Sequence, residues 1–370
     1  MKVSSRIVSI DVFRGMTIAL MIIVNTPGSW SYVYPPFRHA HWHGWTPTDL
    51  VFPFFLFIMG VSMAFSFAKY DYRISPSFTK KVLRRSAVIL LIGWALRAFP
   101  FTGFDIETFR WMGVLPRIAW VYLLASFAVA LFSRRNLLII GLLILAVYWW
   151  SLWYWGGQDP FSLEANLPRR IDLAVLGEKH LWRGLGIAFD PEGIWSTFPA
   201  VVTTISGFLY GYQMKVQKVT VPFLRASTAL GLAIVALAYL VDFFFPINKS
   251  LWSSSYVLLT TGLGIVILAG LAYLLDIINW KRGNYFFLVF GRNALMGFVL
   301  SIFFVKIMLY VWKYTKADGT IENGYHWLFT RVFQPVLGNN PGSFAFALVY
   351  MLLIWAILFA MDRKGIYVKI

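Results

Sequence analysis

Cysteine is absent from the 370-residue sequence, and charged residues are scarce. The absence of cysteine excludes disulfides, thiolate nucleophiles and cysteine-based metal sites. Charged side chains make up 13% of the chain, about half the share usual in a soluble domain, which is too few to cover a soluble surface. The sequence also lacks a phosphate-binding P-loop, a GxSxG nucleophile elbow and a dinucleotide-binding fingerprint. These absences argue against the commonest nucleotide and hydrolase chemistries.

Long apolar runs recur along the whole chain, which is 59% hydrophobic with a mean hydropathy of +0.67. Runs near 20 residues are typical of membrane-crossing helices. The sequence therefore predicts an all-α, polytopic membrane protein with a single domain over residues 1–370. The third expected span is short, and the ninth is long enough to be tilted or broken. The ten expected spans are 7–27, 49–68, 86–99, 114–133, 137–154, 197–214, 226–245, 255–277, 285–312 and 341–361.

The basic residues lie between the apolar runs, so the net charge of +17 indicates topology rather than nucleic-acid binding. Most of them fall in the short loops on the side of the N-terminus. The positive-inside rule then places both termini in the cytoplasm, with the first span retained rather than cleaved as a signal peptide. The larger outer loops are 28–48, 155–196 and 313–340, and all five histidines fall outside.

Three of the five histidines, His39, His41 and His43, lie in FRHAHWHGW (37–45). A histidine at a helix mouth can act as a general base or accept an acyl group, because its ordinary pKa lies near neutrality. Two other interpretations remain open. The loop could form an interfacial belt with its tryptophans, or it could bind zinc, although a structural zinc site would need four ligands.

Two further polar residues flank this loop. TPTD (46–49) predicts a helix start, with Thr46 as cap and Asp49 as the acid of a capping box. Asn25, at the outer end of the first span, could orient an imidazole or bind a carbonyl oxygen. Its more common use would be as a cap before Pro27.

Charged side chains also occur at the inner ends of two spans. Asp11 and Arg14 lie in SIDVFRG, and Arg292 and Asn293 lie in VFGRNALMG. Charges within spans are costly and often functional, and arginine binds phosphate well. The alternatives are a simple Asp11–Arg14 pair on one helix face and arginines that snorkel to lipid headgroups.

Two outer segments could bind a sugar. Asp190 and Glu192, in AFDPEG, could bind an amine or hydroxyl groups, or could simply shape a turn. PINKSLWSSSY (246–256) places Asn248, Lys249 and Trp252 at another outer helix mouth, which suits sugar stacking or the membrane interface alike.

Taken together, an ordered series of segments resembles the heparan-α-glucosaminide N-acetyltransferase family, which includes a lysosomal enzyme and bacterial relatives. The resemblance covers most of the chain. The segments that carry it are SIDVFRGMTIALMIIVN, FRHAHWHGWTPTDLVFPFFLFIMG, GVLPRIAWVYL, LGEKH, FDPEGI, PINKSLWSSSYV and FGRNAL.

The resemblance implies transfer of an acetyl group from cytosolic acetyl-CoA to the amine of a glucosamine residue across the membrane, with no metal. It places the active-site histidine on His39 and the catalytic asparagine on Asn25. The remaining candidates fall into two groups. Arg14, Arg292 and Asn293 are the candidate acetyl-CoA ligands, and Asp49, Asp190, Glu192, Asn248 and Trp252 are the candidate substrate-binding residues.

The acceptor and the class of protein are less closely defined. The loop from Asn25 to His39 is longer than the family pattern and carries two prolines, so a free amino sugar fits as well as a glycan end. An amino-sugar permease is the alternative function, and a scaffold is a third, but internal repeats typical of transporters are not evident. The expected location is a bacterial inner membrane, and a second copy of the chain is a candidate partner.

Overall fold

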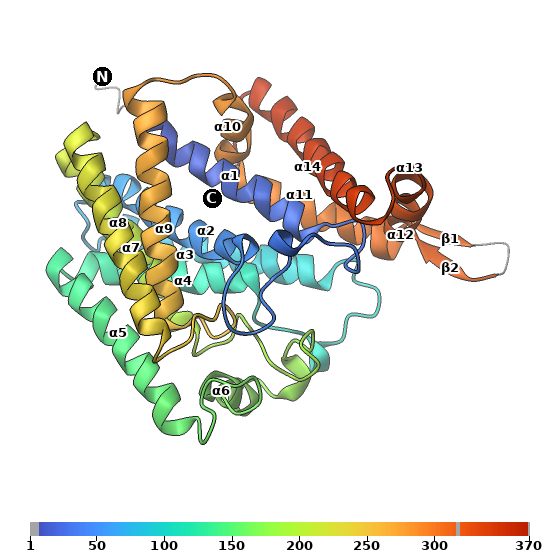
Figure 1. The fold of residues 1–370 in the computed structure, drawn as a ribbon, viewed down its shortest axis with the longest axis horizontal. Helices are drawn as coiled ribbons and strands as arrows, with labels where there is room; N and C mark the ends of the chain where they lie inside the picture. Colours follow the sequence, from blue (N-terminus) through green and yellow to red (C-terminus); the bar gives the residue numbers. More distant parts are fainter. Residues whose placement is uncertain (1–6, 316–318, 369–370) are drawn as a thin grey trace.

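The computed structural model describes residues 7–315 and 319–368, which are almost entirely helical (Figure 1). A short antiparallel hairpin in the outer loop 313–340, β1 (Lys313–Thr315) and β2 (Ile321–Asn323), is the one departure from the all-α prediction within the described residues. The helices are α1 (Val8–Asn25), α2 (Val51–Ser66), α3 (Pro76–Ala98), α4 (Val114–Leu131), α5 (Arg134–Trp155), α6 (Leu167–Val175), α7 (Thr197–Gln217), α8 (Val221–Asp242), α9 (Ser254–Ala272), α10 (Asn284–Arg292), α11 (Ala294–Lys306), α12 (Gly324–Leu328), α13 (Gln334–Leu337) and α14 (Asn339–Arg363).

Every one of the ten expected spans coincides with helix, and the polytopic membrane class is confirmed. In the described part of the chain, eight helical segments are long and apolar enough to cross a membrane. The two expected spans outside that set, α3 and α7, form as helices but are more polar. α3 begins at Pro76, ten residues before its expected start, because basic residues on its first turns lower its hydropathy without breaking the helix.

The long ninth span is broken, as its length had suggested. α10 ends at Arg292 and α11 begins at Ala294, with Asn293 between them in a non-helical backbone conformation (φ −123°, ψ 40°). A break in a membrane helix frees backbone groups, which must then find other partners. At this break, the Asn293 side chain forms hydrogen bonds with the C-terminal tail.

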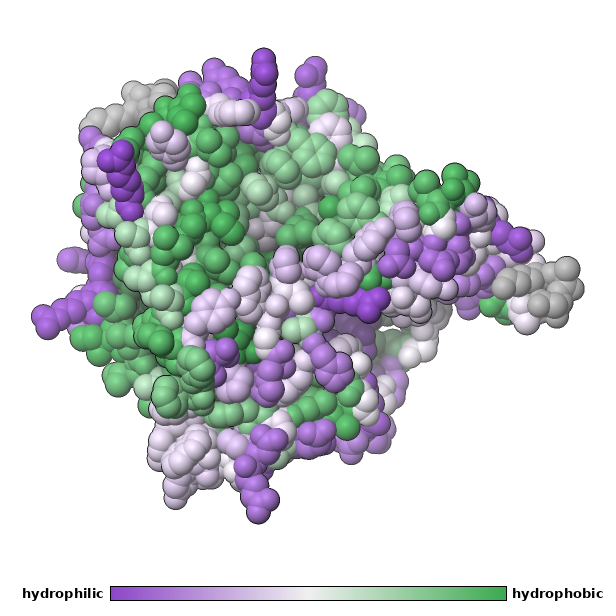
Figure 2. Space-filling view, viewed as in Figure 1, coloured by the Kyte–Doolittle hydropathy of each residue, from purple (hydrophilic) through white to green (hydrophobic). Residues whose placement is uncertain are grey.

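Large apolar side chains remain on the outside of the molecule, as Figure 2 shows for one face. A membrane-spanning bundle needs such a surface because its outer side chains face lipid rather than water. The exposed leucines of two helices illustrate this: α5 presents Leu138, Leu142 and Leu143, and α8 presents Leu230, Leu232, Leu237 and Leu240.

Glycines set the closest helix crossings. A Cβ atom on Gly60 of α2 would lie 1.9 Å from the Thr204 carbonyl oxygen of α7, and one on Gly207 would lie 2.0 Å from the Phe57 carbonyl oxygen. Small residues of this kind let two helix backbones approach within a membrane. The α2–α7 crossing holds the second span, and therefore the loop that precedes it, in a fixed place.

The two described chain ends lie at the same end of the bundle. The backbone N–H of Val8 donates to Asp276, just beyond α9, at 2.9 Å. Asn293 bonds the tail in both directions: its amide donates to the Ile366 carbonyl, and its oxygen accepts from the Val368 N–H, each at 3.0 Å. We call this the inner end, and the end that carries the His39 loop the outer end.

Candidate active site

His39 and Asp49 form a hydrogen-bonded pair at the outer start of the second span. Nδ1 of His39 lies 2.6 Å from Oδ1 of Asp49. The other oxygen, Oδ2, accepts from the N–H groups of Ala40 and Thr46, each at 3.0 Å, and from the Thr46 hydroxyl at 3.1 Å. The predicted capping box is present. Because a carboxylate only accepts hydrogen bonds, Nδ1 is the donor, and in the neutral imidazole the lone pair then lies on Nε2.

His39 lines a cavity of about 170 Å³, with Asn25 in the same wall. The His39 side chain is 42% exposed, so it is accessible to a substrate. Asn25 is the last residue of α1, and its amide donates to the Met21 carbonyl at 2.9 Å. The structure therefore brings together the two residues that the resemblance identified, although 14 positions separate them in the sequence.

Lys249 also lines this cavity, and the candidate site residues from the sequence do not include it. Its Nζ lies 3.0 Å from Nδ1 and 3.4 Å from Nε2 of His39, and 3.4 Å from Oδ1 of Asp49. Burial lowers the pKa of the Lys249 ammonium, although Asp49 and Glu192 act to raise it. The sequence signal was its place at an outer helix mouth in PINKSLW.

The loop that carries Lys249 is tied directly to the histidine loop. The N–H of Gly44 donates to the Ile247 carbonyl at 2.7 Å, and Nδ2 of Asn248 lies 3.4 Å from Nδ1 of His43. Burial lowers the pKa of His43, partly offset by Asp159 and Asp242. His41 is exposed and does not line the cavity. Within the described residues, no three histidine or carboxylate side chains converge as metal ligands.

Asn248 and Trp252, two of the predicted sugar-binding residues, do not line the cavity. Asn248 is buried, and its oxygen accepts from the Leu251 N–H at 2.8 Å. Trp252 is 1% exposed, its Nε1 donates to the Thr203 hydroxyl at 3.1 Å, and it packs edge-on against Phe52. Both side chains point into the protein and hold the Lys249 loop in place.

Asp190 and Glu192 are both paired with Arg110, a residue outside the candidate set. Arg110 bonds Asp190 with two nitrogens, at 2.7 and 2.8 Å, and its NH2 group also bonds Glu192. Burial alone would lower the pKa of Arg110, but these two carboxylates raise it. Asp190 is buried, both its oxygens accept hydrogen bonds from Arg110, and it does not line the cavity. Glu192 does line the His39 cavity.

A second cavity, of about 380 Å³, lies at the inner end and is lined by four basic side chains. Arg14 bonds Asp11 at 3.0 Å, and Arg292 bonds Asp362 at 3.0 Å, so each is held by an acid while it faces the cavity. Asn293, the third predicted acetyl-CoA ligand, hydrogen-bonds the C-terminal tail and does not line this cavity. The two basic residues that the sequence analysis did not select are Lys81 and Arg85, both from α3.

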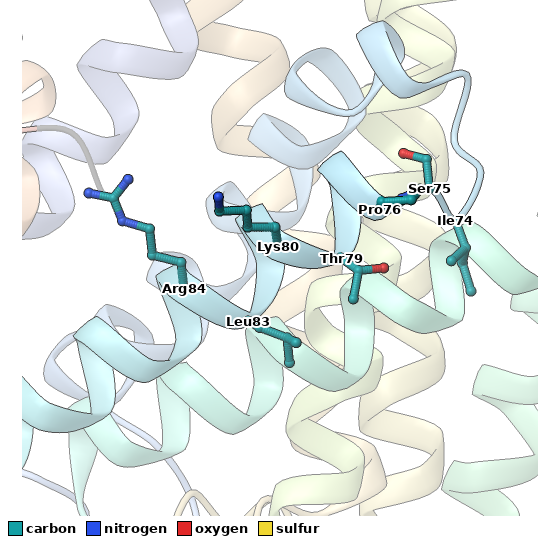
Figure 3. Close-up of a pocket in the computed structure, with 7 residues that line it drawn as sticks. All are labelled: Ile74, Ser75, Pro76, Thr79, Lys80, Leu83 and Arg84. Atoms are coloured by element: carbon teal, nitrogen blue, oxygen red, sulfur yellow. The ribbon is translucent and has the colours of Figure 1, made fainter.

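A third hollow lies on a different face of α3 (Figure 3). Its volume is about 780 Å³, and it is lined only by residues 74–84, among them Lys80 and Arg84. None of the residues that line the two other cavities borders it. α3 therefore carries two basic faces, and only Lys81 and Arg85 face the inner cavity.

The outer and inner cavities adjoin. They share four lining residues, all apolar: Phe55 of α2, Leu115 and Ile118 of α4, and Leu295 of α11. An apolar neck thus separates a basic inner chamber from an outer chamber that holds the His39 imidazole. This arrangement suits a ligand with an anionic head at the inner end and a reactive group at the outer end.

Sequence comparisons find one matching family and two similar proteins. Residues 6–155 match the family described as heparan-alpha-glucosaminide N-acetyltransferase, catalytic. The match covers 150 of the 370 residues, and the chain is similar to that family over this segment. It is 29% identical over 364 residues to the heparan-alpha-glucosaminide N-acetyltransferase of Homo sapiens, which covers 83% of this chain and 54% of the relative. The Mus musculus protein of the same name is 26% identical over 376 residues, covering 86% and 57% respectively.

The family comprises membrane acetyltransferases that use acetyl-CoA. The matched segment includes Asn25, His39, Asp49 and the basic residues of α3, whereas Lys249 lies beyond it. The chain spans about half the length of the curated relatives it matches.

Proposed function

We propose that the protein transfers an acetyl group from acetyl-CoA to the amine of glucosamine, or of a glucosamine residue at a glycan end. The observation that carries this proposal is the pair of adjoining cavities. A basic chamber and an imidazole chamber share an apolar neck, which matches the successive parts of acetyl-CoA: phosphates, a long uncharged arm and a thioester.

The phosphates would bind in the inner chamber. Arg14, Lys81, Arg85 and Arg292 supply four cations there, and charge-assisted bonds to phosphate are among the strongest in proteins. Arg14 and Asn25 lie eleven residues apart on α1, or roughly 16 Å along the helix. The extended arm of CoA spans a distance of this order, so the thioester would reach His39.

His39 would act as the general base. Nε2 removes a proton from the acceptor amine as its nitrogen attacks the thioester carbonyl, and the new C–N bond gives a tetrahedral oxyanion. The amide of Asn25 would donate to this oxygen. Collapse breaks the C–S bond, and the CoA thiolate takes the proton from His39. A route through acetyl-His39 uses the same Nε2, and rapid quenching followed by mass spectrometry would distinguish the two routes.

The sidedness forms part of the proposal. Both described chain ends and the basic chamber lie at the inner end, and the positive-inside rule favours the cytoplasm for that end. Acetyl-CoA would then enter from the cytoplasm of a bacterial cell, and the amine would bind at the outer face of its inner membrane. Glu192 is the cavity carboxylate available to the sugar.

The function is tested with purified protein, radiolabelled acetyl-CoA and glucosamine. We expect acetyl-CoA to bind and N-acetylglucosamine to form with release of CoA. A permease would also use an open path but has no use for acetyl-CoA. Glucosamine uptake into vesicles without acetyl-CoA binding would overturn the proposal in favour of transport.

A further inference from the structure

Lys249 lies against the imidazole that the proposed chemistry uses. It comes from the α8–α9 loop, 210 positions from His39, and its Nζ lies 3.0 and 3.4 Å from the two ring nitrogens. Nδ1 already donates to Asp49. A cation at similar distances from both nitrogens therefore acts on the charge of the whole ring, rather than through one specific bond.

We propose that Lys249 is a positioning residue whose ammonium keeps His39 neutral and able to act as a base; this inference rests on the proposed acyl transfer. Without Lys249, the carboxylate of Asp49 at 2.6 Å would favour the imidazolium form of His39. An imidazolium has no lone pair on Nε2 and cannot accept the proton of the amine. The ammonium opposes that effect because a second positive charge so near it is unfavourable.

Lys249 is the charged residue at the cavity that can oppose the effect of Asp49 on the imidazole. Burial lowers the pKa of Lys249, whereas Asp49, which contacts both Lys249 and His39, acts in the opposite direction and favours the ammonium form of the lysine. Glu192 lines the same cavity, but Arg110 neutralises it through a direct ion pair. Among the described residues that line this cavity, Lys249 is the sole lysine or arginine.

The position of Lys249 is well defined. The backbone of its loop bonds to the histidine loop at Gly44, and the neighbouring Trp252 and Asn248 are buried. The Lys249 side chain is only 23% exposed. Such burial limits the rotamers available to Nζ and keeps it close to the ring, where a surface lysine would move freely in water.

The test measures the protonation of His39 without relying on catalysis. Diethyl pyrocarbonate modifies neutral imidazole, and fragment ions in mass spectrometry resolve His39 from His41 in the same loop. The modification rate would be followed from pH 5 to 9 in the parent, Lys249→Met and Lys249→Arg. Lys179→Met is the matched control, because that lysine is 70% exposed at the outer end and lies outside the cavity.

We expect Lys249→Met to move the midpoint of His39 modification to higher pH by about one unit, with roughly tenfold slower modification on its acid side. Lys249→Arg and Lys179→Met should keep the parent midpoint, and His41 should be unaffected in every variant. The acid limb of kcat/KM should shift in parallel with the midpoint in Lys249→Met, which a purely structural role would not produce.

An unchanged His39 midpoint in folded Lys249→Met would overturn the inference. Lys249→Gln serves as a second charge-free variant if Lys249→Met fails to fold. The two proposals can fail separately. A shifted midpoint in a protein that never transfers acetyl groups would retain the role of Lys249 and reject the acyl-transfer function.

Discussion

At the scale of single residues, the geometry of the site depends on the hydrogen bonds that Asp49 accepts. Four hydrogen bonds converge on its two oxygens, three from the loop that precedes α2 and one from His39. The carboxylate therefore shapes the loop and orients the imidazole at the same time. Replacing it changes the tautomer of His39 as well as its direction, in the way that an orienting acid acts in hydrolytic triads.

Asp49→Asn should lower kcat by about 10²–10⁴-fold, because an amide donor facing Nδ1 would force the proton onto Nε2. Acetyl-CoA binding, measured by calorimetry, should stay within twofold of the parent. The comparison is His41→Ala, which removes an exposed imidazole of the same loop and should retain most of the activity. Equal losses in the two variants would contradict the tautomer argument.

Asp172 of α6 is a buried acid from which we expect the folding stability to depend on pH. Burial raises its pKa to about 7, with a further rise from Asp190 that the Ile194 N–H partly offsets. Its Oδ2 has no hydrogen-bond partner among the described residues. The folded pKa lies above the unfolded one, so the stabilising proton is fully present below about pH 4 and is lost as the pH rises to about 7.

Asp172→Asn should therefore raise the unfolding temperature at pH 8 and have little effect at pH 4. The gain corresponds to roughly 4 kcal/mol at most, from a shift of about three pKa units. Asp159→Asn, an exposed acid in the preceding loop, is the control and should change little at either pH. A gain of equal size at both pH values would show that Asp172 is not the titrating group.

At the scale of elements, the α2–α7 crossing fixes the second span. Gly60→Ala would place a methyl group 1.9 Å from the Thr204 carbonyl oxygen, so the two helices must separate. We expect a loss of about 1–3 kcal/mol in reversible denaturant unfolding. Gly270→Ala in α9 is the matched control, since nothing lies within 4 Å of its added Cβ. Comparable losses in both variants would refute a specific crossing.

Elements were easier to predict from the sequence than the directions of side chains. Each apolar run located by hydropathy coincides with helix, and the length of the ninth run predicted either a tilt or the break that occurs at Asn293. Hydropathy missed the first turns of α3, because its basic residues lie on a helix that continues regardless. The sequence did not predict the burial of Trp252, whose backbone adopts a positive φ of 52° and whose side chain enters the core. Residue type alone does not reveal such a turn.

The candidate site was predicted only in part, for a similar reason. His39 and Asn25 follow from a resemblance that spans most of the chain. Lys249 reaches His39 from 210 positions away, a contact that only the packing of two outer loops creates. Arg110 likewise meets Asp190 across 80 positions. Long-range pairs of this kind carry no local pattern of spacing.

At the scale of the whole molecule, the two basic faces of α3 allow specific binding of acetyl-CoA to be distinguished from general attraction by positive charge. Arg85→Ala should weaken acetyl-CoA binding by about 1–3 kcal/mol, since Arg85 lines the inner cavity. Arg84→Ala, one residue earlier, removes a guanidinium from the other hollow of α3 (Figure 3) and should leave binding unchanged. Calorimetry on both variants checks this. Equal weakening would indicate general attraction by positive charge.

The central claim is that an acetyl group passes from a donor at the inner end to an amine at the outer end, in a reaction that depends on His39. The most direct measurement uses right-side-out vesicles that contain labelled acetyl-CoA, with glucosamine supplied only outside. The account predicts N-acetylglucosamine in the outer solution, formed at least 100-fold more slowly by His39→Ala even though that variant still binds acetyl-CoA. A near-normal rate in His39→Ala, or product that forms only when both substrates share one side, would contradict it.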